Sequence, residues 1–552
     1  MIAIKRSFAT FCRERDVLLL WLIALSIFMF GIWQQPFVNF ETRFAVFAQE
    51  MLRHGLTLFP TTYGQPYPDY PVTSTVLIWL ASLPFGQVTK FSAVLPTALA
   101  SSTIVALTYK LLAQYSKQWG VLAVGFELLT VSFLAESRSI SVDQILSAIT
   151  VSAFYLTHKS YRNGLPLPTR NLVLLLVAGF LVRGPIGIVL PAGVVLSHLL
   201  LTSERRVVVA FSAWSSTTLI LCGATLWGLA VFIYGSEFAS NVIRMQIVGR
   251  FAESTPLPRY YYFTSSFGNY ALSYPIAVIV AASALFAKFK RIAFNERNDR
   301  TSIVLLLVAW MAIVFVGLSI PETKKVRYIL PAAPALAALA SYIFLGSGNA
   351  LLKWTRRCVE LILVTLPLLA VAFVYLRRSQ LVGYGISVDP AICIFIALFL
   401  CQLAIMFFVD RNGVRRSIGL VFIGVFLVLY ATITMVEPID LRIHDTSRFV
   451  QHIESLREKQ PGNVVFYKEN PDALPIKYLV NVKGDLLPEF IADLDSLGHN
   501  QSPIWLLTKE KNIDDLKAIG LDAQSQIVRD HFGDLPFVAV YVPTLSATTV
   551  RP

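Results

Sequence analysis

The chain has 552 residues, of which 55% are hydrophobic and only 15% charged, and its mean hydropathy is +0.62. This composition excludes a soluble globular protein, because long apolar runs recur along the whole chain. The formal net charge of +13 needs no nucleic-acid partner, since the basic residues gather in short loops between apolar runs, as membrane orientation requires. The five cysteines lie in or beside apolar runs without a spacing that suggests disulfides or a zinc site.

The first apolar run, Val17–Trp33, is too long and too aromatic for a cleaved signal peptide, and no small-residue cleavage site follows it. We therefore predict an uncleaved membrane helix. Its flanking basic residues predict a cytoplasmic N-terminus; they are Lys5, Arg6, Arg13 and Arg15. The segment 35–90 is then the first loop on the outer side.

Within that loop, Val72–Phe85 is apolar but short, and Pro84 and Gly86 close it. If it crossed the membrane, every later basic loop would face outward, so we predict a juxtamembrane or re-entrant segment. With the first helix, the later runs predict about thirteen spans. They are 91–113, 118–135, 143–157, 170–182, 186–201, 207–233, 271–287, 302–319, 329–346, 359–376, 391–409 and 417–435. The split at Arg183-Gly184-Pro185 keeps the basic Lys288–Arg300 loop inside.

An odd number of spans predicts that the tail from Glu437 lies outside the cytoplasm. Its composition becomes charged, and short apolar runs at 463–467, 503–507 and 537–542 predict strands. Intervening segments, 487–497 and 512–519, predict helices. We expect a transmembrane domain over 1–436 and a small extracytoplasmic α/β domain over 437–552.

Basic residues on the outer side break the orientation rule, and the sharpest case is Ile320–Pro331, IPETKKVRYILP. Clustered cations near the membrane surface suit the phosphate of a lipid-linked substrate, although they can instead bind lipid headgroups or the tail domain. The members of this segment proposed to bind phosphate are Lys324, Lys325, Arg327 and Tyr328. Arg377-Arg378 lies in an ordinary polar loop, which favours a structural role for this pair over phosphate binding.

A second outer loop, Arg244–Tyr262, combines arginines with three consecutive tyrosines. The tyrosines are most simply an interfacial aromatic belt, whereas Arg250 and Arg259 are candidates to reach a phosphate.

Outward carboxylates form a second set of candidates, because they can act as a general base or hold a divalent ion. Glu41 is the preferred candidate. Asp143 fits a helix N-terminal role equally well, and Asp69 in PYPDYP fits a turn. Glu50 is expected to pair with Arg53, and Glu136 with Arg138.

At these residues the chain resembles the bacterial lipid A aminoarabinose transferases and the wider polyprenyl-phosphate-sugar-dependent glycosyltransferases related to protein O-mannosyltransferases. The family's first loop reads acidic-Glu-Thr-Arg, then Glu-Met-Leu, Gly, Pro and aromatic-Glu-Lys-Pro. The matching residues fall at the same spacing; they are Glu41-Thr42-Arg43, Glu50-Met51-Leu52, Gly55, Pro60 and Asp69-Tyr70-Pro71. Weaker matches are Arg183-Gly184-Pro185, Arg250-Phe251, Arg259-Tyr260-Tyr261 and Tyr328-Ile329-Leu330-Pro331.

The resemblance implies a GT-C fold with about thirteen spans and an outer C-terminal domain, in a bacterial inner membrane. It implies inverting transfer of a sugar from an undecaprenyl-type monophosphate to lipid A, another envelope glycan or a protein. Glu41, Asp69 and Asp143 are then catalytic candidates, and Arg43, Tyr70 and Arg183 support them. A metal ion is not strictly required and a divalent ion stays open.

Two positions depart from the family pattern. Phe40 stands where the family has an acid, and Asp69-Tyr70 replaces the family's Glu-Lys pair. Lys324, Lys325 or Arg327 can supply the cation that Tyr70 lacks. The rival hypotheses are a flippase for a lipid-linked sugar, which the odd span count disfavours, and a catalytically inactive binding relative, which Phe40 and Tyr70 suggest.

Overall fold

The computed structural model describes residues 2–69, 73–246, 248–251, 256–290, 298–345, 349–410, 413–494, 502–518 and 526–543. The chain divides into two compact units. The helical unit comprises Met1–Phe30, Pro68–Ser74 and Val94–Met435. The mixed unit comprises Gly31–Tyr67, Thr75–Ala93 and Val436–Pro552, so it combines most of the first loop with the tail.

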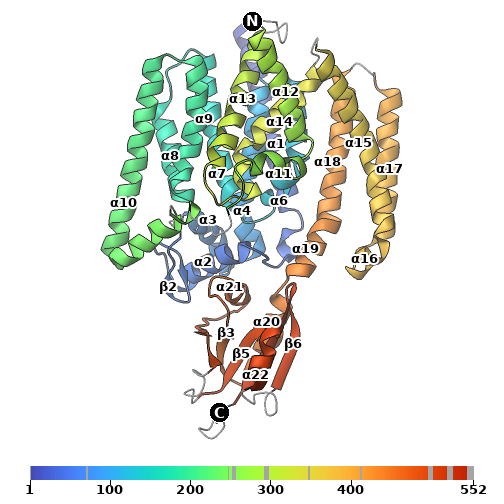
Figure 1. Cartoon of the computed structure of the whole chain (residues 1–552). Coiled ribbons are helices and arrows are strands. Elements are labelled where there is room, and N and C mark those ends of the chain that lie inside the picture. Colours follow the sequence, from blue (N-terminus) through green and yellow to red (C-terminus); the bar gives the residue numbers. More distant parts are fainter. Residues whose placement is uncertain are drawn as a thin grey trace. The chain divides into compact units, whose positions relative to one another are not determined.

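The helical unit consists of helices and short connections (Figure 1). Its helices are α1 (Ile2–Met29), α4 (Lys90–Leu112, whose first turn belongs to the mixed unit), α5 (Lys117–Leu128), α6 (Val131–Ser137), α7 (Val142–Arg162), α8 (Thr169–Arg183), α9 (Ile186–Thr202), α10 (Arg205–Gln246), α11 (Tyr261–Asn269), α12 (Ser273–Phe289), α13 (Asn298–Ser319), η4 (Val326–Ala332), α14 (Ala333–Ser341), η5 (Tyr342–Leu345), α15 (Ala350–Leu376), α16 (Arg378–Gly383), α17 (Val388–Phe408) and α18 (Val414–Ala431).

Seven described helices are long and apolar enough to cross a membrane, or eight if the bent pair α5–α6 forms one span. Shorter apolar helices cover Ser74–Phe85, Ile186–Thr202 and Ser273–Phe289. These helices confirm a polytopic α-helical membrane protein. The count of about thirteen spans stays a prediction.

The centre of the helical unit is the segment Val326–Leu345, most of whose residues are buried. Two buried tryptophans fix its backbone, because the indole of Trp119 donates to the Ala338 carbonyl at 2.9 Å and that of Trp310 to the Pro331 carbonyl at 2.9 Å. Figure 1 shows α8, α9 and α10 on one side of α7 and α13, and α15, α17 and α18 on the other side.

The predicted break at Arg183-Gly184-Pro185 is confirmed, since α8 ends at Arg183 and α9 begins at Ile186. Gly184 has φ 60° and ψ −148°, a conformation that a side chain disfavours. The two helices then pack backbone to backbone, because a Cβ on Gly179 would lie 2.1 Å from the Gly187 carbonyl oxygen. Glycine at both positions therefore allows the close hairpin that carries Arg183.

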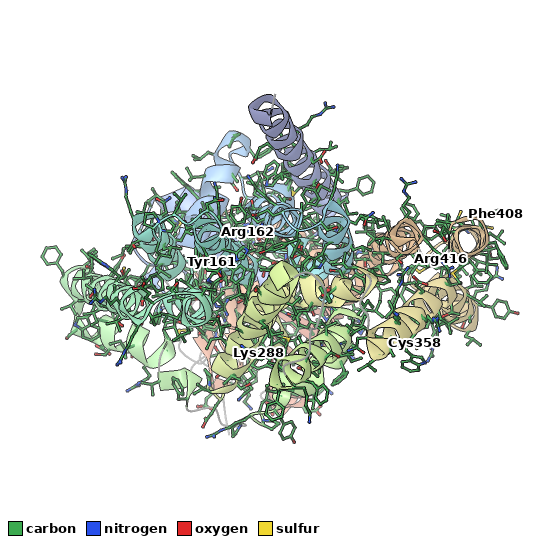
Figure 2. The ribbon with its side chains drawn as sticks, turned by 90° about the horizontal axis from the view of Figure 1, so that it is seen from above. Tyr161, Arg162, Lys288, Cys358, Phe408 and Arg416 are labelled. Carbon is green, nitrogen blue, oxygen red and sulfur yellow. The ribbon has the colours of Figure 1, made fainter. Side chains whose placement is uncertain are left out.

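Some basic residues lie at the end of these helices that Figure 2 views. Arg162, Lys288 and Arg416 are labelled there, and each belongs to a loop or helix end that the charge pattern predicted to be cytoplasmic. Because α7 ends at Arg162 and α8 returns from Thr169, the start of α7 and the end of α8 share the opposite end.

The mixed unit contains α2 (Glu41–His54), β1 (Thr61–Thr62), β2 (Gln65–Pro66), most of α3 (Thr73–Ser82), η2 (Leu83–Phe85), α19 (Glu437–His444), α20 (Ser447–Lys459), β3 (Asn463–Tyr467), α21 (Leu474–Leu479), β4 (Glu489–Ile491), β5 (Ile504–Lys509), α22 (Ile513–Ala518), β6 (Gln526–Phe532) and β7 (Leu535–Val542). Five strands form one sheet in the order β4-β3-β5-β7-β6, with β3 parallel to β4 and β5. Residues Phe449, Val450 and Ile453 give α20 a buried apolar face.

The three strands predicted in the tail are confirmed as β3, β5 and β7, and the helix predicted at 512–519 as α22. The helix predicted over 487–497 is wrong, because Glu489–Ile491 pairs with β3 and Phe490 stacks on Phe466. The edge strand β6 was not predicted, since its sequence QIVRDHF is mostly polar.

Candidate functional site

The first residue of α2, Glu41, forms a buried ion pair with Lys90 at the start of α4, and both belong to the mixed unit. Glu41 is 3% exposed and Lys90 5% exposed. The Lys90 ammonium also donates to the Pro36 carbonyl at 3.4 Å and lies 5.8 Å from the centre of the Phe37 ring. Desolvated charges of this kind are retained only when paired, so this contact fixes both helix starts.

The same helix α2 uses its two arginines to hold the tail. Arg43 donates to the Asp472 carbonyl at 3.1 Å and its guanidinium lies 5.4 Å from the Tyr67 ring centre. Arg53 lies 3.5 Å from the Asp485 carboxylate. The predicted Glu50–Arg53 pair is therefore wrong. Glu50 instead accepts a hydrogen bond from the Thr61 hydroxyl at 3.2 Å, because β1 folds back over α2.

In the helical unit, Asp143 lies between two arginines. Its carboxylate is 2.6 Å from the Arg183 guanidinium and 3.4 Å from that of Arg327. The Arg183 guanidinium also lies 4.8 Å from the centre of the Tyr328 ring. The side chains of Asp143 and Arg183 are 3% and 7% exposed, whereas that of Arg327 is 21% exposed. Two arginines against one aspartate give this cluster a formal charge of +1 at the end of the helices opposite the basic loops.

An apolar cavity of about 380 Å³ opens beside Arg183. Its walls are mainly apolar side chains of α9, of α13 and of the residues that follow α13, and its polar members are Arg183 and Gln246; the aliphatic lining includes Ile186, Val189, Leu190, Ile313, Leu318 and Ile320. The amide of Gln246 donates to the Asp69 carboxylate at 2.8 Å. The cavity therefore joins a long apolar wall to a cationic end, the two properties of an amphiphile with an anionic head.

The cation cluster predicted at Ile320–Pro331 divides in the structure. Lys324 is buried and its ammonium donates to the carbonyls of Leu257 at 3.0 Å and Pro321 at 2.6 Å, so it links two loops. Lys325 and Arg259 are exposed, and only Arg327 and Tyr328 reach the Asp143 cluster. The predicted contributions of Tyr70 and of the Arg250 side chain lie outside the described residues.

Arg138, another basic residue predicted to lie on the outer side, has a structural explanation. It is 3% exposed and donates to the carbonyls of Ile27 at 2.8 Å, Phe28 at 3.2 Å and Phe30 at 2.8 Å. Ile27 and Phe28 belong to the last turn of α1 and Phe30 follows it directly, so the guanidinium caps that helix end.

The sequence is similar to those of known membrane glycosyltransferases. Residues 69–227 match the family described as dolichyl-phosphate-mannose-protein mannosyltransferase. The undecaprenyl phosphate-alpha-4-amino-4-deoxy-L-arabinose arabinosyl transferase of Pseudomonas aeruginosa is 26% identical over 385 residues, which are 66% of this chain and 67% of that protein. An uncharacterized protein of Aquifex aeolicus is 24% identical over 404 residues, which are 69% of this chain and 76% of that protein.

A solved structure extends the likeness to the whole chain. The crystal structure of ArnT from Cupriavidus metallidurans bound to undecaprenyl phosphate matches with a TM-score of 0.68 and 14% identity, covering 97% of this chain and 98% of that one. At this identity the match shows a shared fold, and the sequence relatives add the enzyme class.

The chain is a glycosyltransferase that is similar to ArnT.

Two residues of this glycosyltransferase were missed by the sequence reasoning. Lys90 lies at the end of the loop that the sequence predicts to be outside, and it is the first residue of α4, so the orientation rule that marked the other basic residues applied to it as well. The contact of Gln246 with Asp69 could not be predicted from the sequence, because an uncharged polar residue near a helix end is common. Among the described residues, no group of three His, Cys, Asp or Glu side chains is arranged to hold a metal ion.

Proposed function

We propose that this glycosyltransferase moves a sugar from an undecaprenyl-type monophosphate to an acceptor such as lipid A or another envelope glycan on the periplasmic side. The names of its relatives support the donor class: a Pseudomonas enzyme named for undecaprenyl-phosphate aminoarabinose, and ArnT crystallised with undecaprenyl phosphate. The proposed orientation has a cytoplasmic N-terminus and a periplasmic tail, as the basic loops predict.

One observation carries the proposal: the apolar cavity beside α9 and α13 has Arg183 at its polar end. A polyprenyl chain gains free energy from apolar walls at about 25 cal/mol per Å² of area removed from water. Its phosphate needs a cation where the chain ends, and the Asp143–Arg183–Arg327 cluster has a formal charge of +1. The donor phosphate is therefore assigned to Arg327, Arg183 and Tyr328, with exposed Arg259 and Lys325 as outer cations.

In the proposed reaction, the acceptor oxygen attacks the anomeric carbon as the bond from that carbon to the phosphate oxygen breaks. The configuration inverts, and polyprenyl phosphate leaves with the electron pair. Arg183 and Arg327 stabilise the charge that grows on the leaving group. Asp143 positions both guanidiniums, whereas Glu41, fixed by Lys90, orients the acceptor or takes its proton. Asp69 has a positioning role through Gln246.

The test is transfer by the full-length protein in proteoliposomes. A panel of radiolabelled polyprenyl-phosphate sugars is supplied with lipid A, and both the free polyprenyl phosphate and the labelled acceptor are measured. We expect Arg327→Gln to lower transfer by about 100-fold, because it removes a charge that faces the leaving group. Arg378→Gln is the matched control, since Arg378 forms an exposed ion pair with Asp389. A donor that crosses the bilayer with its glycosidic bond intact would contradict the proposal.

A further inference from the structure

A group of charged side chains that the proposed transfer reaction does not use lies where α15 and α18 begin and α17 ends. Figure 2 views this end of the helices and labels Arg416 of α18 together with Phe408 of α17 and Cys358 of α15. The charge pattern predicts that this end is cytoplasmic. All three helices belong to the helical unit, and Figure 1 shows them across α7 and α13 from α9, whose side chains line the cavity at Arg183.

Two arginines share one buried carboxylate in this group. The Glu360 carboxylate is 2.9 Å from the Arg356 guanidinium and 3.6 Å from that of Arg416. It also accepts a hydrogen bond from the Ser417 hydroxyl at 2.8 Å, and Arg356 donates to the same hydroxyl at 3.0 Å. The carboxylate is therefore committed mainly to Arg356, and one glutamate against two arginines leaves a formal charge of +1.

Arg416 is the poorly compensated member of this group. Its side chain is 5% exposed, yet the distance of 3.6 Å to the Glu360 carboxylate is too long for a hydrogen bond. The guanidinium contacts the thioether sulfur of Met406, which is a weak acceptor, and its Nε is buried without a hydrogen-bond partner in the described part of the chain. A buried guanidinium in this environment costs free energy, which an anion within hydrogen-bond distance would offset.

Exposed cations continue the positive charge on both helices. Lys353 and Arg357 are four residues apart on α15, so they share the helix face that carries Arg356. Arg415 is exposed in the first turn of α18. The described residues at this end carry five cations and two carboxylates, a formal charge of +3; they are residues 349–360, 402–410 and 413–418. Membrane orientation needs only basic residues in the loops, so it does not explain an arginine that is buried among three helices.

The start of α18 adds backbone donors to these cations. The helix begins at Val414 after Gly413, and among the described residues no side chain caps its first turn. Its unpaired N–H groups and the positive end of its dipole favour an anion. The start of α15 differs, because the Asn349 side chain accepts from the Leu351 N–H at 2.9 Å. An anion is therefore expected at the start of α18, on the side of Arg416.

An apolar surface adjoins the same cations. Trp354 and Leu361 of α15 and Phe407 and Phe408 of α17 are exposed, as expected of side chains that face lipid at and below the headgroups. Basic sites between membrane helices at the cytoplasmic side bind acidic lipid headgroups, because charge and acyl chain are satisfied together. The anion that fits this place is thus the headgroup of a lipid.

We propose that Arg416, Arg415 and the start of α18 bind the phosphodiester of an anionic phospholipid in the leaflet predicted to be cytoplasmic. Lys353 and Arg357 are its outer cations. The bound phosphodiester supplies Arg416 with the partner that Glu360 does not provide, and the acyl chains lie along α15 and α17. The site is separate from the cavity at Arg183, and measuring it needs no sugar donor.

The test titrates the full-length protein in detergent with phosphatidylglycerol or with phosphatidylcholine of the same acyl chains, and native mass spectrometry counts the bound lipid. We expect one phosphatidylglycerol to bind at least tenfold more tightly, because it alone has a net negative charge. Arg416→Gln should lower this affinity by about tenfold or more. Arg357→Gln/Arg415→Gln removes two exposed cations, so its fold should be kept, and it should lower the affinity by about fivefold per cation.

Arg377→Gln/Arg378→Gln is the matched control, because it removes two exposed arginines at the opposite end of α15 and should bind phosphatidylglycerol as the wild type does. Equal affinity of the wild type for the two lipids would overturn the inference. So would an equal loss in the control, or unchanged affinity in Arg357→Gln/Arg415→Gln. Inorganic phosphate that displaced phosphatidylglycerol with the same affinity would show a site for free anions and would also overturn it.

Discussion

Exchanging both members of the Asp143–Arg183 ion pair separates their structural role from the role proposed for them in sugar transfer. Arg183→Met alone leaves the Asp143 carboxylate, which is 3% exposed, in an ion pair with the Arg327 guanidinium at 3.4 Å. Breaking a buried pair on one side costs about 3–5 kcal/mol. Replacing both members by apolar side chains of similar size is often close to neutral. We therefore expect the free energy of unfolding of Asp143→Leu/Arg183→Met to lie within about 1 kcal/mol of the wild-type value.

Activity should respond differently from stability. Both the single and the double variant lack the guanidinium at the polar end of the cavity, so both should lose sugar transfer by about 100-fold or more. Unfolding is measured in mixed detergent micelles, and transfer in proteoliposomes at the same protein concentration. Arg378→Met is the control, because its pair with Asp389 is exposed and contributes about 1 kcal/mol or less. If the double variant regained both stability and transfer, Arg183 would have no role at the phosphate.

Three further predictions concern packing, capping and pH. Gly179→Val should lower the melting temperature and the yield of folded protein, because its Cβ would meet the Gly187 carbonyl at 2.1 Å. Arg138→Met should destabilise the protein by about 2 kcal/mol or more in the same unfolding assay, since it removes charged donors from the end of α1. The Lys468 ammonium, hydrogen-bonded to Asp515, lowers the pKa of that carboxyl. The Asp515–Lys468 contact therefore stabilises the fold above the unfolded pKa of the carboxyl, near 3.9, and this stabilisation is lost as the pH falls through the lower folded pKa. Hydrogen exchange of the β3 amides should accordingly depend less on acid in Asp515→Asn than in the wild type.

Each of these variants has a matched control. Gly193→Ala meets its nearest neighbour, Ile313, at 3.4 Å and should be tolerated. Arg378→Met tests whether loss of any arginine lowers stability. Asp514→Asn removes an exposed carboxylate of the same helix, α22, and should leave the acid sensitivity unchanged. Equal effects of a variant and its control would refute the contact invoked for it.

The membrane character of this enzyme was predictable because apolar runs and basic loops are local signals. The same holds for the α8–α9 break, where Gly184 and Pro185 follow directly on Arg183. The edge strands β4 and β6 were not predictable, since pairing with a distant strand decides them and their own sequences are polar or short.

The candidate site was predictable by residue type but not by pairing. Asp143 and Arg183 were both identified, yet their contact depends on how α7 and α8 meet at one membrane face. Lys324 shows the opposite case, because its position in a cationic turn suggested a phosphate ligand whereas its ammonium binds backbone carbonyls. Lys90 was missed because its partner Glu41 lies far away in the sequence.

The central claim, that the apolar cavity at Arg183 holds the polyprenyl phosphate, is tested most directly by photo-crosslinking. A diazirine-bearing polyprenyl phosphate is bound to the full-length enzyme, irradiated, and its attachment sites are mapped by mass spectrometry. The account predicts crosslinks in α9 and α13, around Val189 and Ile313, that excess undecaprenyl phosphate abolishes and Arg183→Met weakens. Crosslinks confined to α15 and α17, or labelling of α9 that Arg183→Met leaves unchanged, would contradict it.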